Sequence, residues 1–256
     1  MGGAQQAMNW ETWPSVAAAL FWGLFSSAAL FLGQLLAKPL GRSERAVGLM
    51  MGFGGGTLLA AVAYELIPES NLQDGWQIIA SAMVGALTYY VGDRLVDRGG
   101  GAARVAVATG KGEGGSGMAM FLGALLDGIP EAFILGLGLA LGGEVSLAFL
   151  AAIFVSNIPQ GLAGTTSLQE AGTPGRRITV MWGLLTVACG VASLLGYVMA
   201  DSLTHVGTYA SAFAGGAVLM MLADSMIPES YRHGGRLVGL LTVIGFLVAG
   251  ILTVLQ

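Results

Sequence analysis

The sequence has 256 residues, of which 55% are hydrophobic, only 10% are charged and 42 are glycine. Soluble domains carry about 25% charged residues, so this composition excludes an ordinary soluble enzyme and indicates a polytopic membrane protein. The formal charge of −4, without a basic run that could neutralise phosphates, speaks against nucleic acid as a partner. One cysteine and two histidines exclude a disulfide framework and a His-rich metal site.

Eight apolar stretches follow one another along the chain, each long enough to cross a hydrocarbon core about 30 Å thick. They span residues 16-37, 46-67, 76-92, 118-141, 145-166, 178-199, 207-227 and 236-255. A Gly-rich loop at 93-117 separates the third span from the fourth, and no soluble domain fits between any of the spans. We therefore expect residues 1-256 to form a single all-α transmembrane domain.

The basic residues fall in alternate loops of this arrangement. They are Lys38, Arg42 and Arg45; Arg94, Arg98, Arg104 and Lys111; Arg176 and Arg177; and Arg232 and Arg236. Loops rich in Lys and Arg stay on the cytoplasmic side of a membrane. The pattern predicts eight crossings with both termini outside, in a cell membrane of the bacterial inner membrane type.

One segment recurs at an offset of 160 residues. The stretch from Phe53 to Ser70 matches the stretch from Phe213 to Ser230 at 9 of 18 positions without a gap, and both copies end in Ile-Pro-Glu-Ser. The copies lie in the second and seventh spans, which cross the membrane in opposite directions. This predicts an inverted repeat in a 3+2+3 arrangement, as in many secondary transporters. The alternative is a recurrence of composition alone, since both copies are glycine-rich and contain a proline.

The fourth and fifth spans each contain a proline near the middle. Pro130 and Pro159 lack a backbone N–H, which leaves carbonyl oxygens without their helical partner at membrane depth. Asp127 and Glu131 flank Pro130 four residues apart, so both carboxylates lie on one helical face. Intramembrane acids face the bundle interior and are functional candidates, and a bound cation would relieve their mutual repulsion. The alternative is that both acids are protonated and hydrogen-bonded to neighbouring helices.

Neutral polar residues surround Pro159 at similar spacing. Ser156 and Gln160 are four residues apart, and Asn157 and Gln160 are three apart. These side chains either complete a cation site with the two acids of the fourth span or hydrogen-bond the membrane helices to one another.

At these residues the sequence resembles the ZIP family of divalent metal transporters, and the resemblance covers essentially the whole chain. In that family the fourth span reads His-Asn-x-Pro-Glu-Gly, and these ligand positions fall on Asp127, Gly128 and Glu131. The ligand positions of the family's fifth span fall on Ser156, Asn157 and Gln160. Only Glu131 keeps the family's residue as a strong ligand, and the sixth span lacks the glutamate that many members carry.

The resemblance implies a transporter, not an enzyme, that moves a divalent metal cation through a site between the fourth and fifth spans. The metal ligands would be Asp127, Glu131, Ser156, Asn157 and Gln160. This set is all oxygen, which makes manganese, magnesium, calcium or iron as credible as zinc. The lipid bilayer is the other expected partner, and a homodimer is one option. Two alternatives stay open: a transporter of the same architecture that moves protons or a small organic cation, and a membrane protein that binds metal without transporting it.

Four further acids form a second tier along the expected pathway. Glu65 and Asp224 would flank the site on either side, with Glu69 and Glu229 at its mouths. The alternative for the two Ile-Pro-Glu-Ser motifs is a helix stop at the membrane interface. His205 and His233 are expected in solvated loops, without a site.

Overall fold

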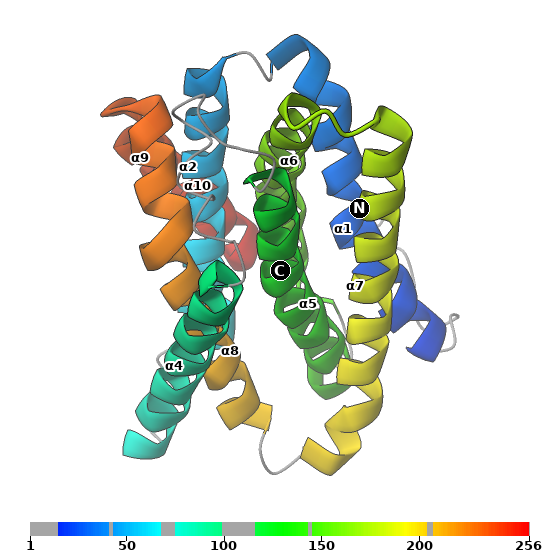
Figure 1. The fold of residues 1–256 in the computed structure, drawn as a ribbon. Helices are drawn as coiled ribbons and strands as arrows, with labels where there is room; N and C mark the ends of the chain where they lie inside the picture. The colour runs from blue at the N-terminus through cyan, green and yellow to red at the C-terminus, as the bar shows by residue number, and fades with distance from the viewer. Residues whose placement is uncertain are drawn as a thin grey trace, which may run out of the picture.

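The structure is a computed structural model that describes residues 15–40, 43–67, 75–98, 116–142, 145–203 and 207–255. Nearly all of these residues are helical, and the long helices run in alternate directions, with α2 continuing into η2 and α8 continuing into η4 and α9 (Figure 1). The helices are α1 (Ser15–Leu40), α2 (Glu44–Ala61), the π-helical η2 (Val62–Leu66), α4 (Trp76–Arg98), α5 (Ser116–Gly142), α6 (Leu147–Glu170), α7 (Gly175–Leu203), α8 (Gly207–Met221), the π-helical η4 (Leu222–Met226), α9 (Ile227–Gly234) and α10 (Leu237–Val254).

Seven membrane spans are recognisable among the described residues by length and apolar character. They are Val16–Leu40, Glu44–Leu66, Phe121–Ala140, Leu147–Glu170, Gly175–Ala200, Thr208–Gly234 and Leu237–Val254. Large apolar side chains stay exposed along them, as at Leu184 and Val187 on α7 and at Val243 and Leu247 on α10. A soluble protein rarely exposes so many apolar side chains to water, whereas such side chains are favourable in contact with lipid. The chain is therefore an all-α, multi-pass membrane protein, as the composition indicated.

The expected third span, 76-92, lies inside α4, which is not among the seven. Its last two turns contain the charged residues Asp93, Arg94, Asp97 and Arg98, and its mean hydropathy is lower than that of the other long helices. The outer face of α4 nevertheless exposes Ile79, Met83 and Leu87, which are four residues apart.

The expected seventh span does not end at the proline of its Ile-Pro-Glu-Ser motif. α8 continues through η4 into α9, which carries Pro228 at its start and ends only at Gly234. In η4 the N–H of Ile227 donates to the carbonyl of Leu222, a wider π-type turn. This turn changes the helical register ahead of Pro228, whose ring would clash with the preceding turn of a regular α-helix. For Pro228 the interpretation as a helix stop is therefore wrong.

The helix η2 contains the equivalent π turn 160 residues earlier. There the N–H of Ile67 donates to the carbonyl of Val62 at 2.9 Å. The other copy of the proline motif, from Pro68 to Ser70, lies outside the described residues, and so does Glu69.

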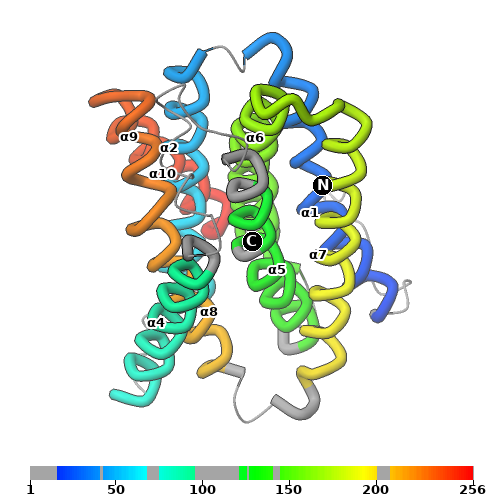
Figure 2. The backbone as a smooth tube through the Cα atoms, viewed as in Figure 1, coloured from blue at the N-terminus to red at the C-terminus, as the bar shows by residue number. Residues whose placement is uncertain are grey.

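The helices form two bundles (Figures 1 and 2). In the first bundle α1 packs on α6 and α7, and α5 packs on α7. In the second bundle α2 packs on α10 and α9, and α4 packs on α8. The bundles meet mainly where α2 lies against α6, with smaller contacts of α5 on α8 and α4.

Reciprocal glycine contacts hold four of these helix pairs together. In each pair, a Cβ on either glycine would overlap the backbone carbonyl three residues before the other glycine. The pairs are Gly33 with Gly161, Gly136 with Gly196, Gly56 with Gly245, and Gly85 with Gly216. Small residues let membrane helices approach this closely, so each bundle is built from two tightly packed pairs.

Basic residues mark one end of the molecule. Lys38 lies in the last turn of α1, Arg45 at the start of α2, Arg176 at the start of α7 and Arg232 in the last turn of α9. These four helix ends lie together at the top of Figure 1.

Candidate cation site

The proline segments of α5 and α6 lie within continuous helices, as expected. Pro130 is inside α5 and Pro159 inside α6, and the two helices contact each other in the first bundle. Neither proline ends its helix, although each lacks the N–H of a regular helical hydrogen bond. The two motifs therefore bring their polar side chains into the middle of the protein.

Glu131 is the most deeply buried acid among the described residues, with only 1% of its surface exposed. Neither carboxylate oxygen has a hydrogen-bond partner within the described part of the chain. Asp127, one turn earlier on α5, lies near enough to repel its charge. Burying a carboxylate without partners is costly, so Glu131 requires either a proton or a bound cation.

Asp127 lies on the same helix in a different environment. It is half-buried, and the hydroxyl of Tyr89 on α4 donates a hydrogen bond of 2.7 Å to its Oδ1 atom. This bond joins the first bundle to the second. Tyr89 did not stand out in the sequence, because no motif relates it to the helix that carries Asp127.

A cavity of about 60 Å³ opens beside Asp127, between the two bundles. It is lined by Met51, Gly123, Ala124, Asp127, Gln160, Ala163, Ser225, Met226 and Glu229. The Oε1 atom of Gln160 is buried and has no hydrogen-bond partner among the described residues. The structure therefore brings together two predicted ligands, Asp127 and Gln160, with the second-tier acid Glu229.

Ser156 and Asn157 serve the packing of the first bundle instead. The hydroxyl of Ser156 donates to the carbonyl of Ile153 at 2.9 Å, and the amide of Asn157 donates to the carbonyl of Ser26 on α1 at 3.2 Å. Both side chains are buried, and neither lines the cavity. Their arrangement matches the alternative interpretation, in which polar residues join membrane helices.

The remaining second-tier acids lie away from the cavity. Glu65, in η2, accepts a hydrogen bond of 3.3 Å from the hydroxyl of Thr253 on α10. Asp224, in η4, is exposed on the surface. Neither acid is part of the cavity lining.

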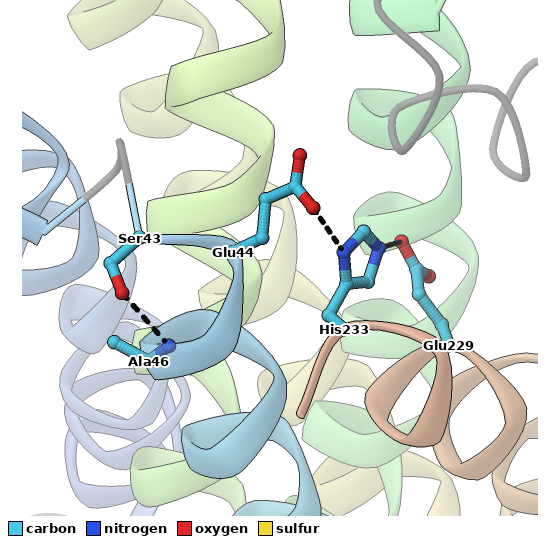
Figure 3. Close-up of polar contacts among 5 residues, drawn as sticks. All are labelled: Ser43, Glu44, Ala46, Glu229 and His233. Carbon is cyan, nitrogen blue, oxygen red and sulfur yellow. Dashed lines mark hydrogen bonds and ion pairs between the residues drawn. The ribbon is translucent and has the colours of Figure 1, made fainter. Parts of the chain in front are cut away.

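His233 was expected in a solvated loop, and that expectation is wrong. It lies on α9, and its side chain is only 7% exposed. Its Nδ1 atom is 3.7 Å from Glu44 of α2 and its Nε2 atom 4.0 Å from Glu229, as Figure 3 shows. The four-residue spacing of Glu229 and His233 could have indicated this pair, had the helix been expected to continue beyond Pro228. His205 lies outside the described residues.

Cys189 is a second buried side chain for which the sequence analysis predicted no role. It lies on α7 with 1% of its surface exposed, beside Ser27 of α1. Its sulfur would be 3.2 Å from a Cβ on Gly128, so the missing side chain at Gly128 makes room for the thiol against α5.

Among the described residues, no three His, Cys, Asp or Glu side chains come close enough together to hold one metal ion by themselves. A cation here would also need the amide oxygen of Gln160, backbone carbonyls or water as ligands. In comparisons with known proteins, no family model and no curated protein sequence matches the chain.

Proposed function

We propose that this chain is a ZIP-like transporter that moves a divalent metal cation across the membrane through the region between α5 and α6. The observation that carries the proposal is the carboxylate of Glu131, which is buried inside a membrane protein and has no hydrogen-bond partner for either oxygen among the described residues. Intramembrane acids that face a bundle interior mark ion pathways. Asp127 and Gln160 add oxygen donors at the adjoining cavity.

An inverted repeat supports a transport function. The π turns at Ile67 and Ile227 are 160 residues apart, the offset at which the sequence recurs. The glycine pairs follow the same offset. Gly56 corresponds to Gly216 and Gly245 corresponds to Gly85, so the crossing of α2 and α10 is equivalent to the crossing of α8 and α4. An exchange of α2 with α8 and of α10 with α4 therefore reproduces the packing of the second bundle. Repeats of this kind let a transporter open to either side by similar movements.

The division into two bundles supports alternating access. Each bundle is held by close backbone contacts at glycines, whereas the cavity lies between the bundles. Movement of one bundle against the other would change access to Asp127 and Gln160 without disrupting either bundle. With Lys and Arg on the cytoplasmic side, the end that carries α9 is the cytoplasmic end, and both termini lie outside.

The donor chemistry favours an ion that accepts oxygen ligands. Carboxylate and amide oxygens suit manganese, magnesium and iron, while zinc remains compatible with carboxylates. A proton or a small organic cation is the second candidate cargo, since an unpartnered buried acid would also accept a proton. A metal-binding protein without transport is the third.

Uptake into proteoliposomes tests the proposal. Wild-type protein should carry Mn²⁺ or Zn²⁺ into vesicles, and Glu131→Gln, which keeps the size of the side chain but removes its charge, should abolish uptake. Glu170→Gln, at an exposed acid on the last turn of α6, is the matched control and should leave uptake unchanged. Uptake that survives Glu131→Gln would contradict the assignment. Binding of metal without flux would favour the third candidate, and flux of protons alone the second.

A further inference from the structure

The cavity is lined from both bundles, and each contributes a carboxylate. Asp127 and Gln160 come from α5 and α6 of the first bundle, while Glu229 comes from α9 of the second. Two carboxylates match the charge of one divalent cation. The buried Oε1 atom of Gln160 has no partner in the described part of the protein, so a residue of the cavity lining carries an oxygen that no described protein group satisfies.

The size of the cavity suits a partly hydrated ion. A single water molecule needs a cavity of about 10–15 Å³. The cavity of about 60 Å³ therefore accommodates an ion with a few water molecules. Divalent cations such as Mn²⁺ accept carboxylate oxygens, amide oxygens and water together. Met51 and Met226 also line this space, and their polarisable side chains are compatible with a softer ion.

Glu229 lies beside His233, with 4.0 Å between its Oε1 atom and the Nε2 atom of the imidazole. The imidazole is buried between α2 and α9, with Glu229 on its Nε2 side and Glu44 on its Nδ1 side (Figure 3). α9 packs closely on α2 at this point, since a Cβ on Gly48 would lie 2.8 Å from the Cβ of His233. Glu44 is 65% exposed, so this row of side chains leads from the cavity to the surface.

We propose that a divalent cation binds in this cavity between Asp127 and Gln160 on one bundle and Glu229 on the other, with His233 as the residue that positions Glu229. This inference rests on the proposed transport function and extends it. The ion bridges the two bundles in the arrangement seen here. When the bundles separate, the ion loses Glu229 and binds more weakly, which couples release to the movement.

Equilibrium binding of Mn²⁺ to the full chain in lipid nanodiscs tests the inference, together with the KM for Mn²⁺ uptake. Glu229→Gln should weaken binding by more than about tenfold, and His233→Gln by about tenfold, the effect typical of a group that orients a metal ligand. Because His233 acts through Glu229, the double variant should bind no more weakly than Glu229→Gln alone. Glu170→Gln is the control, because this acid on the last turn of α6 is exposed and outside the cavity.

The outcomes separate this inference from the proposed function. If wild-type protein neither binds nor takes up a divalent cation, the proposed function fails. If Glu131→Gln abolishes uptake but Glu229→Gln leaves the Kd and KM within twofold of wild type, only the cavity site is overturned. Additive effects of Glu229→Gln and His233→Gln would overturn the positioning role of His233. Should Glu229→Gln fail to fold, Gln160→Met removes the opposing donor at similar volume and should weaken binding in the same way.

Discussion

The hydroxyl of Tyr89 donates a 2.7 Å hydrogen bond to Oδ1 of Asp127, and this bond crosses from the second bundle to the first. Tyr89 is itself buried, with 9% of its surface exposed. A bond from a buried donor to a carboxylate both orients the acid and favours the arrangement in which the two bundles are close. The orientation of a candidate metal ligand thus depends on a helix from the other bundle.

Tyr89→Phe removes this hydrogen bond while keeping the ring. Because Asp127 loses the group that orients it, we expect Mn²⁺ binding to weaken about tenfold, as for other partners of metal ligands. Isothermal titration of wild type and variant in nanodiscs measures the change. Tyr197→Phe, on α7 and away from the cavity lining, is the control. Equal affinity in wild type and Tyr89→Phe would show that the bond does not support the site.

The glycine crossings should be sensitive to any added side chain. In Gly56→Val the new side chain would overlap the backbone carbonyl of Thr242 on α10, which cannot rotate away. Overpacking of this kind costs about 1–3 kcal/mol of unfolding free energy. Thermal unfolding should show a lower midpoint for Gly56→Val and also for Gly216→Val, the equivalent change on α8 where it crosses α4.

Gly183→Ala, on α7, provides the matched control. A Cβ at Gly183 meets no atom within 4 Å, so this substitution should be neutral or slightly stabilising through its better helix propensity. If Gly56→Val and Gly183→Ala unfolded at the same temperature, the close crossing of α2 and α10 would be refuted.

The sequence predicted the helices well because each depends on local composition. The apolar stretches, the interior positions of Pro130 and Pro159 and the burial of Glu131 all follow from length, hydropathy and the cost of a charge in lipid. Both copies of the repeat are glycine-rich, but a run of glycines does not show which helix it contacts. That Gly56 meets Gly245 and Gly85 meets Gly216 depends on how distant helices pair.

The parts of the site that the sequence did not predict depend on two kinds of information. Tyr89 reaches Asp127 through tertiary packing, which no local pattern encodes. The sequence analysis placed His233 in a loop because a proline, here Pro228, normally ends a helix. The π turn of η4, which lets the helix continue, has no clear sequence signal. Ser156 has the spacing of a ligand, yet its hydroxyl is used within its own helix.

Orientation in the membrane is testable from the positions of the basic residues. Ala171, between α6 and α7, lies near Arg176, whereas Trp76 begins α4 at the opposite end of the bundles; both residues are exposed. In a Cys189→Ser background, Ala171→Cys should react with an impermeant maleimide only from the cytoplasmic side and Trp76→Cys only from outside. Labelling of right-side-out and inverted vesicles checks this, and the reverse pattern would contradict the proposed topology.

Protection of an introduced cysteine by a cation tests whether the cavity is an ion site in the folded protein. Ala163 lines the cavity but has no polar group, so Ala163→Cys in the Cys189→Ser background adds a reactive atom without removing a proposed ligand. A small charged thiol reagent should modify this cysteine, because the cavity between the bundles admits water, and saturating Mn²⁺ should slow the modification several-fold by occupying the same space. Ala152→Cys, on the same helix but 1% exposed and outside the cavity, should react slowly with or without the ion.

Adding Glu229→Gln should abolish the protection at Ala163→Cys while leaving its basal reactivity, since the variant removes a ligand without closing the cavity. If Mn²⁺ protected the cysteine of Ala163→Cys equally with and without the Glu229 carboxylate, Glu229 would not be a ligand. The ion would then bind elsewhere, and the deeper acid Glu131 would be the next candidate.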